Sequence, residues 1–312
     1  MGEWSKTVGE KGEKIVNFFF RDILGYKKIL HNQTIECIKG TKHKEKSAKS
    51  DRTTHGVDAL ISAVSPVEDN TLDVGYISSK FTSEIYPNAP KGKFKEHLTD
   101  LAHGLECYKN SELSSTINQT YSKIKKTEVT GILVWASNKS PNDENIVSKV
   151  ANMQLDADLI FDKIIVIDNN RLNFYAETIQ TAKKEFGKDN VKFIYHNSGV
   201  NSLSLQSMSY GDFLPIQYLF SDLIPLRIQK DNNIELLVCS KDEFSVESFS
   251  KVLDFAKSFD HLHSITSTTI SFPDYNDLNH QGEIKKQLAK FEHYDFQTNF
   301  FVKKHTEDFR NY

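Results

Sequence analysis

Residues 55–80 read HGVDALISAVSPVEDNTLDVGYISSK, and this stretch decides the fold. Two apolar runs of strand length flank a polar turn from Ser65 to Thr71, a pattern that predicts a β-hairpin. Asp58 enters the first strand and Lys80 leaves the second. Because adjacent antiparallel strands lie about 5 Å apart, this carboxylate and this ammonium can meet at one end of the hairpin. An acid there can hold a divalent cation through oxygen, and a lysine beside it can polarise a scissile phosphate.

The composition is typical of a globular chain, with 38% hydrophobic and 26% charged residues among 312. This length fits one large domain or two ordinary ones. No apolar run approaches the ~18 residues that a membrane span requires, and Met1–Lys6 has no apolar signal core. The three cysteines are widely spaced, which favours reduced thiols over a disulfide framework or a zinc site. We therefore expect a cytoplasmic protein with no membrane segment.

Basic residues are concentrated in the first part of the chain. Residues 1–126 carry 20 Lys and Arg against 16 Asp and Glu, whereas the remainder carries 19 against 26. The densest basic segment is 39–52, directly upstream of Asp58, and it is either a solvated loop or an arm that contacts nucleic-acid phosphates. On the second interpretation, the residues expected to bind DNA are Lys39, Lys42, Lys44, Lys46, Lys49, Arg52 and His55.

Hydrophobic periodicity predicts the other elements of the first part of the chain. In chain order they are a helix over 6–24, a strand over 34–38, the two hairpin strands, a helix from 93 that reaches 125, and a strand over 129–136. A strand over 163–167, a helix over 176–186 and a strand over 191–195 follow, and they are predicted to extend the same mixed sheet.

The stretch from Asn197 to Ser207 is rich in Asn, Ser and Gly and predicts a boundary. Beyond it the pattern predicts a hairpin over 223–239, a helix over 246–259, a strand over 265–272, a helix over 284–291 and a strand over 299–303. We therefore expect a first domain over 1–196, with its core at 6–136, and an α+β domain over 197–312 that binds a partner or the substrate.

Glu13 on the first helix, Asp58 on one strand and Ser78-Ser79-Lys80 on the next resemble the PD-(D/E)XK nuclease superfamily. The order helix, three strands, helix, strand is also similar to the core of that superfamily. The resemblance implies an α/β fold, a restriction-endonuclease-like mixed sheet flanked by helices, followed here by the α+β region. It also implies that Glu13 and Asp58 bind magnesium and that Lys80 assists the attack of water on a phosphodiester.

The sequence departs from that superfamily at Ser78, where its pattern has an acid two residues before the lysine. Some restriction endonucleases of the superfamily also carry Ser-x-Lys and recruit their second acid from the following helix. Glu96 lies sixteen residues after Lys80 near the start of the predicted helix, and Asp100 lies one turn further on the same face. We expect Glu96 to be the third metal-binding acid, beside Ser78 and Lys80 in the site. Two other acids remain alternatives: Asp73 and Glu84.

The opening Gly-Glu-x-Gly-Glu (Gly9 to Glu13), the His-Gly-Val-Asp box and the Ser-Ser-Lys-Phe-Thr exit (Ser78 to Thr82) are similar to the nuclease-like subunit of two-gene GAPS-type anti-phage systems. This resemblance implies a magnesium-dependent DNA endonuclease in anti-phage defence. It also implies a second protein encoded alongside it, in a hetero-oligomer, with a homodimer as the alternative. Because Ser78 replaces an acid, a DNA-binding or DNA-end-sensing subunit with a degenerate nuclease fold is the alternative function. A scaffold for a defence complex is the third.

Overall fold

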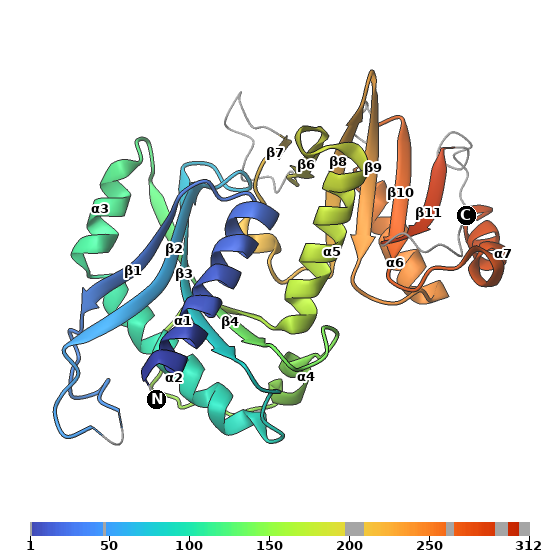
Figure 1. Cartoon of the computed structure of the whole chain (residues 1–312). Coiled ribbons are helices and arrows are strands. Elements are labelled where there is room, and N and C mark those ends of the chain that lie inside the picture. Colours follow the sequence, from blue (N-terminus) through green and yellow to red (C-terminus); the bar gives the residue numbers. More distant parts are fainter. Residues whose placement is uncertain (1, 46–47, 197–208, 260–264, 291–298, 306–312) are drawn as a thin grey trace. The chain divides into compact units, whose positions relative to one another are not determined.

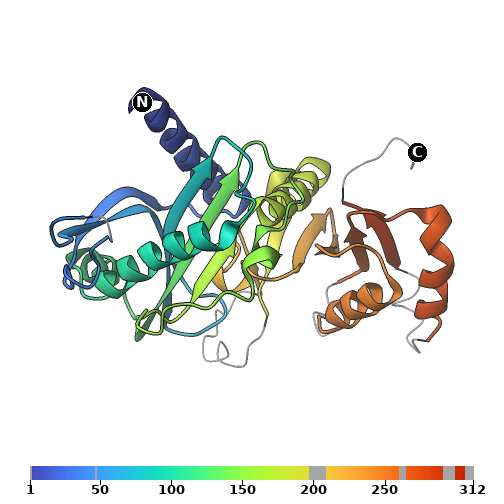
Figure 2. The same cartoon turned by 90° about the horizontal axis from the view of Figure 1, so that it is seen from below.

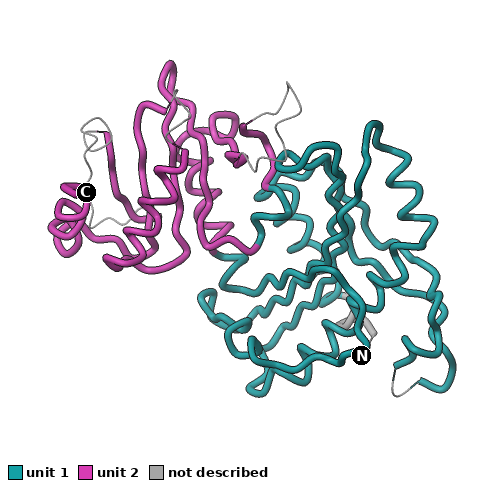
Figure 3. Tube along the Cα trace, turned by 180° about the vertical axis from the view of Figure 1, so that it is seen from behind, with its two compact units in different colours: residues 1–173, 197–207, 215–219 teal, residues 174–196, 208–214, 220–312 magenta. Residues whose placement is uncertain are grey.

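A computed structural model describes residues 2–45, 48–196, 209–259, 265–290 and 299–305 (Figure 1). The chain forms two compact units, which Figure 3 distinguishes by colour. Unit 1 holds the described residues up to Asn173 together with Pro215–Leu219, and unit 2 holds Phe174–His196, 209–214 and the described residues from Phe220 onward. Among the described residues, no helix combines the length and the apolarity needed to cross a bilayer.

Unit 1 is built on a mixed sheet of five strands in the order β1-β2-β3-β4-β5. Its elements are α1 (Gly2–Asn17) with a π-helical turn (Phe18–Ile23), β1 (Ile29–Glu36), β2 (Thr54–Val64), β3 (Thr71–Thr82), α2 (Pro90–Tyr108), α3 (Glu112–Thr120), β4 (Lys126–Ser137), α4 (Ile146–Val150), β5 (Ile164–Ile167) and a 3₁₀ turn (Ile216–Tyr218). β1, β2 and β3 pair antiparallel, whereas β3, β4 and β5 pair parallel. The predicted hairpin and the mixed α/β fold are thus confirmed.

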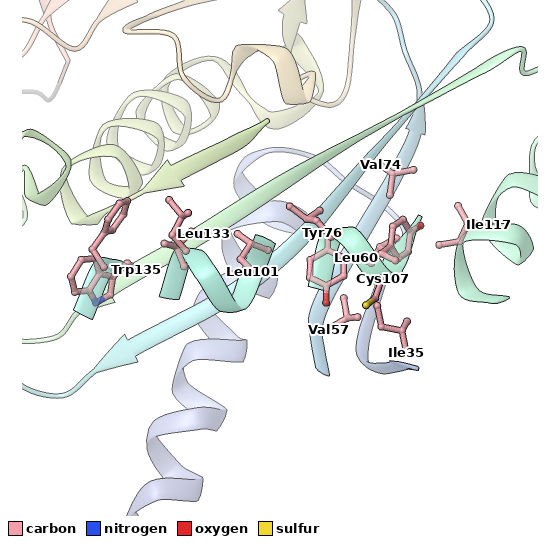
Figure 4. Packing of buried hydrophobic residues seen from close by; sticks show 14 of the residues in the cluster. Ile35, Val57, Leu60, Val74, Tyr76, Leu101, Cys107, Ile117, Leu133 and Trp135 are labelled. Carbon is pink, nitrogen blue, oxygen red and sulfur yellow. The ribbon is translucent and has the colours of Figure 1, made fainter. Parts of the chain in front are cut away.

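Helices cover both faces of this sheet, with α1 on one face and α2 on the other (Figures 1 and 2). The inward side of α2 buries Phe94, Leu98, Leu101 and Leu105, which recur every three or four residues and therefore line one stripe of the helix. This stripe packs on side chains of β2, β3 and β4, and Figure 4 shows Leu60, Tyr76, Leu133 and Trp135 among them. The sheet is thus fixed from the α2 side by an apolar core.

The predicted helix from 93 to 125 is two helices, α2 and α3. The chain turns between them, and Ser111 begins α3 because its hydroxyl accepts the Ser114 N–H at 3.1 Å. The apolar periodicity continues through this turn, and therefore periodicity alone did not reveal the interruption.

The ladder between β2 and β3 ends before the two strands do. Paired residues run from Val64 and Leu72 to Ala59 and Ile77, whereas β3 stays paired with β4 as far as Thr82 and Ser137. The last residues of β3 therefore pair with β4 only. Their opposite edge, which faces the start of β2, has no ladder partner among the described strands.

Unit 2 contains a second mixed sheet of six strands in the order β11-β10-β9-β8-β6-β7. Its elements are most of α5 (Asn169–Phe186), a 3₁₀ turn (Lys188–Asn190), β6 (Val191–Ile194), β7 (Tyr210–Gly211), β8 (Leu223–Lys230), β9 (Asn233–Ser240), α6 (Val246–Lys257), β10 (Ser267–Phe272), α7 (Asp277–Leu288) and β11 (Phe300–Lys304). The hairpin expected over 223–239 is β8 and β9, which pair antiparallel.

The strand expected over 191–195 does not extend the first sheet. It is β6, which pairs antiparallel with β8 in the second sheet, so the division between the compact units falls within α5, after Asn173. The division expected after residue 196 rested on Asn197 to Ser207, and residues 197–208 lie outside the described part of the chain.

Two facing leucines offer a test of the core. Leu30 and Leu60 are cross-strand partners on β1 and β2, but Leu30 is 43% exposed and Leu60 is 1% exposed. We expect Leu60→Ala to lower the free energy of unfolding of unit 1 by about 2–5 kcal/mol, because the substitution leaves a cavity. Leu30→Ala should cost less than about 1 kcal/mol. Urea unfolding followed by circular dichroism measures both, and equal losses would contradict this description of the core.

Candidate active site

A pocket of about 530 Å³ opens in unit 1 beside the unpaired edge of β3. Side chains of α1, β2, β3, α2 and β4 contribute to it, and the segment between β3 and α2 closes one side. The pocket is lined by Val8, Gly9, Gly12, Glu13, Asp58, Ser79, Lys80, Phe81, Thr82, Ile85, Pro87, Lys93, His97 and Trp135. Three residues predicted for the site from sequence, Glu13, Asp58 and Lys80, therefore meet in one cavity.

Gly12 lets α1 approach β3 closely. A Cβ atom at this position would lie 3.0 Å from Ser79 Oγ and 3.2 Å from Phe81 Cβ, tighter than ordinary van der Waals contact. The next residue, Glu13, is thereby placed in the pocket, and its Oε2 accepts a long hydrogen bond of 3.4 Å from Asn32 Nδ2.

Asp58 is fixed by the backbone of the neighbouring strand. Its Oδ2 accepts the Ser79 N–H at 2.6 Å, at the point where the backbone ladder between β2 and β3 has ended. The carboxylate thus satisfies a strand amide that has lost its cross-strand partner. Burial raises the pKa of Asp58, the Ser79 N–H and the Lys80 charge act in the opposite direction, and the nearby acids Asp100 and Glu13 raise it further.

Lys80 shares its counter-ion with Arg52. Its Nζ lies 3.2 Å from Asp100 Oδ2, and Arg52 Nη1 lies 2.8 Å from Asp100 Oδ1. Burial alone would raise the pKa of Asp100, but the charges and hydrogen bonds of Lys80 and Arg52 bring it below its ordinary value. Asp100 is therefore an ionised group that holds the lysine ammonium in place, with each of its oxygens engaged.

Glu96, the acid expected from α2, points elsewhere. Its side chain is 67% exposed, pairs with Lys93 at 2.8 Å, and is not among the described residues that line the pocket. Asp100, one turn further along α2, is the acid that contacts Lys80. The sequence placed both acids on one helical face, but it did not specify which turn of α2 lies level with the end of β3.

The other two candidate acids lie away from Lys80. Glu84 is exposed and pairs with Lys139 at 2.7 Å. Asp73 is buried near the start of β3 and accepts the Gln217 side-chain amide at 2.8 Å. Seven strand residues separate it from Lys80, or about 23 Å.

Ser78 is buried and is not among the described lining residues, whereas Ser79 both lines the pocket and holds Asp58. His97 lines the pocket too, although no motif in the sequence marks it. Its ring packs edge-on against Trp135 at 5.4 Å. Burial, and then the charge of Lys80, lower the pKa of His97 to about 4, so the imidazole is neutral at pH 7.

Part of the basic segment 39–52 is engaged inside unit 1. Lys39 and Lys42 both pair with Glu106 of α2, and Arg52 pairs with Asp100. These cations neutralise buried or half-buried acids, which reduces the charge that they can present to a nucleic acid.

Two lysines of the segment remain on its outer side. Lys49 is exposed, and the half-buried Lys44 donates to the backbone oxygen of Lys49 at 3.0 Å. Lys46 lies outside the described residues. His55 is 1% exposed, so its side chain is removed from any surface that DNA could touch.

Taken together, an acid of β2, a lysine near the end of β3 and a glutamate of α1 line one pocket, which is the arrangement that the resemblance to the PD-(D/E)XK class implied. A family model described as the GAPS4 protein PD-(D/E)XK nuclease domain matches residues 1–171. Because the match spans more than half of the 312 residues, the chain belongs to this family. The match ends at residue 171, two residues before Asn173, where the first segment of unit 1 ends. No curated protein and no solved structure matched the chain.

The two glycines of α1 provide a test of its contact with β3. A Cβ atom at Gly9 would meet nothing within 4 Å, whereas one at Gly12 would crowd Ser79 and Phe81. We expect Gly9→Ala to raise the free energy of unfolding by about 0.5–1 kcal/mol through helix propensity. Gly12→Val should lower it by about 1–3 kcal/mol through overpacking. Thermal unfolding measures both, and a stabilised Gly12→Val protein would contradict the close contact.

Proposed function

We propose that this protein is a magnesium-dependent DNA endonuclease of anti-phage defence, with its active site in the pocket of unit 1. The observation that carries the proposal is that Glu13, Asp58 and Lys80 line one pocket in a chain that belongs to a nuclease family. Widely separated acids and a lysine that converge in a cavity are the arrangement that phosphodiester hydrolysis needs.

The donor set fits a hard divalent cation. Asp58 and Glu13 supply carboxylate oxygens, the ligands that magnesium prefers. Burial, and after it repulsion from Asp100 and Glu13, raises the pKa of Asp58, and a cation between Asp58 and Glu13 would offset this repulsion. When bound, magnesium would stabilise the charge that develops on the phosphate and would acidify a water molecule.

The side chains of the chain have separate tasks in this proposal. The Ser79 N–H donates to Oδ2 of Asp58 and fixes the orientation of the carboxylate, which leaves Oδ1 to bind the metal. Lys80 places a positive charge beside the scissile phosphate, where a fixed cation stabilises the transition state more than the substrate. Asp100 positions Lys80, because both its oxygens already have cationic partners. In this proposal Glu96 has no task, and Asp100 replaces it as the acid of α2.

The alternative function is a DNA-binding or DNA-end-sensing subunit with a degenerate site. The engagement of both Asp100 oxygens favours it, because that leaves two acids, Asp58 and Glu13, for a metal among the described lining residues. A magnesium titration with linear and circular DNA separates the two functions: the endonuclease cuts, whereas the sensor binds without cutting.

We further propose that unit 2 docks a second protein encoded beside this one. Unit 2 carries 15 Lys and Arg against 19 Asp and Glu, a balance that suits a protein partner better than a phosphate backbone. Co-purification with the neighbouring gene product, followed by mass measurement of the complex, tests the hetero-oligomer against a homodimer.

Two substitutions test the active site directly. Asp58→Asn removes a charged oxygen donor and should reduce cleavage to background, while Lys80→Met should lower kcat about 10²–10³-fold. Both proteins should fold, because the amide oxygen of the substituted side chain can still accept the Ser79 N–H and Lys80 is a half-buried end-of-strand residue. A fixed-time assay on plasmid DNA with magnesium measures the loss, and unimpaired cleavage by both variants would remove the site.

A matched pair on α2 serves as the control. Glu96→Gln should cleave at the wild-type rate, whereas Asp100→Asn frees Lys80 and Arg52 and should lower kcat. The reverse ranking would restore Glu96 as the acid of α2.

The outer lysines of the basic segment should contact DNA phosphate. Lys44→Gln with Lys49→Gln should reduce the slope of log affinity against log salt by about 1–2. The reason is that fewer counter-ions are released from DNA when two fewer phosphates are neutralised. Exposed lysines of unit 2, Lys251 and Lys286, provide the control pair. Fluorescence anisotropy at several salt concentrations gives the slopes, and an unchanged slope in the first pair would exclude this segment from the DNA interface.

A further inference from the structure

Four side chains that the active site does not use converge at one point of unit 1. They are Cys37 after β1, His43 in the following loop, His55 at the start of β2 and Cys107 near the end of α2. One nitrogen or sulfur atom from each lies within 4.8 Å of the corresponding atom of every other. Cys37 is half-buried and the other three are buried, and Figure 4 shows Cys107 facing the apolar core near Ile35.

The separations match the edges of a tetrahedron around a small cation. His43 Nδ1 lies 3.3 Å from His55 Nε2, 3.4 Å from Cys37 Sγ and 3.5 Å from Cys107 Sγ. Zinc bonds of about 2.0–2.1 Å to nitrogen and 2.3 Å to sulfur, at tetrahedral angles, require about 3.4 Å between two nitrogens and about 3.6 Å between nitrogen and sulfur.

Hydrogen bonding alone does not account for this arrangement. The other ring nitrogen of His43, Nε2, faces Glu106 Oε2 at 2.9 Å and must donate to it, because an ionised carboxylate only accepts. Nδ1 then has a single in-plane position, for one lone pair or one hydrogen, yet three polar atoms surround it. One central cation would satisfy all four groups at once.

The surroundings are those of a metal-binding histidine and thiolate. Glu106 fixes the ring of His43 through Nε2, as carboxylates do for histidine ligands of metals, and the ring of His103 stacks on it at 4.1 Å. The Cys107 sulfur also accepts hydrogen bonds from the backbone N–H groups of Ile38 and Lys39, which stabilise negative charge on it.

We propose that Cys37, His43, His55 and Cys107 bind a structural zinc ion. Four protein donors complete the tetrahedron and leave no open position for water, which is the coordination of structural rather than catalytic zinc. Two thiolates balance the charge of Zn²⁺, and the soft sulfur donors separate this site from the oxygen-lined pocket around Asp58.

The zinc would connect the basic segment 39–52, through His43, to α2, through Cys107. The segment is already closed at its base, where the Cys37 N–H donates to Thr53 O at 2.8 Å and the Arg52 N–H donates to Gly40 O at 3.2 Å. Arg52 reaches Asp100, which holds Lys80. On the proposed nuclease function, the ion would therefore help to position the catalytic lysine without touching it.

The first experiment measures metal. Full-length protein from zinc-supplemented medium, after gel filtration in chelator-free buffer, should contain about one zinc per chain by plasma mass spectrometry. Magnesium held by a few carboxylates and waters should be lost in the same step. Protein that retains no zinc, or that carries iron instead, would overturn the assignment.

Variants locate the ion. Cys107→Ser and the milder Cys37→Ser should lose bound zinc, while Cys239→Ser, at a buried cysteine of β9 outside the cluster, should keep it. Glu106→Gln should weaken zinc about 10–100-fold in competition with a chromogenic chelator, because it removes the partner of His43. Full zinc in both Cys37→Ser and Cys107→Ser would refute the site.

A spectroscopic measurement avoids any dependence on the folding of the variants or on nuclease activity. Wild-type protein exchanged with cobalt should show the intense visible bands of tetrahedral Co²⁺ and a thiolate charge-transfer band. Added zinc should abolish both. The absence of a thiolate band in the cobalt-loaded protein would overturn the proposal, whereas loss of DNA cleavage with the bands intact would count against the nuclease function alone.

Discussion

The hydrogen bond between the Asp58 carboxylate and the Ser79 N–H is the interaction on which the pocket depends. It forms where β2 stops pairing with β3, so an acidic side chain takes over from the backbone. A hydrogen bond to a charged group contributes about 1.5–3 kcal/mol, enough to hold one rotamer of a half-buried side chain. The divergence of the two strands also opens the space in which Lys80 and Glu13 line the same pocket. The end of the ladder between β2 and β3 therefore both positions Asp58 and opens the pocket.

The charges around this bond are uneven. On one side, Asp58 and Glu13 face the pocket, and burial, with the nearby charges of Asp100 and Glu13, raises the pKa of Asp58. On the other, Asp100 lies between two cations and is ionised despite its burial. Asp58 and Glu13 therefore leave negative charge facing the pocket, whereas Asp100 already has its counter-ions. The same residue type therefore serves two purposes, which the surroundings and not the sequence spacing determine.

Much of unit 1 could be predicted from its sequence, since period and turn residues locate the hairpin strands and both long helices. Glu13, Asp58 and Lys80 were predicted from their resemblance to the PD-(D/E)XK pattern, and the structure brings them to one pocket. Asp100 was passed over for Glu96, because spacing along a helix does not say which turn lies level with a strand end. His55 was predicted to contact DNA because it follows the basic segment 39–52, but the alternation of side chains along β2 turns it inward. The cluster of Cys37, His43, His55 and Cys107 was not predicted, because its members are far apart in the chain and the wide cysteine spacing favoured reduced thiols over a zinc site.

Helix α5 gives the two units a common element. Its first residue, Asn169, is buried and bonds to Tyr86, and to Ser137 of β4, within unit 1, while from Phe174 onward the helix belongs to unit 2. The family match ends at residue 171, inside the first turn. A chain severed there would leave a helix nucleus with no turns to follow it, and short isolated turns are unstable in water. Any recombination that exchanged the second unit between relatives would therefore have to keep this helix whole, so its junction would lie at one end of α5 and not at residue 171, where the matched domain ends.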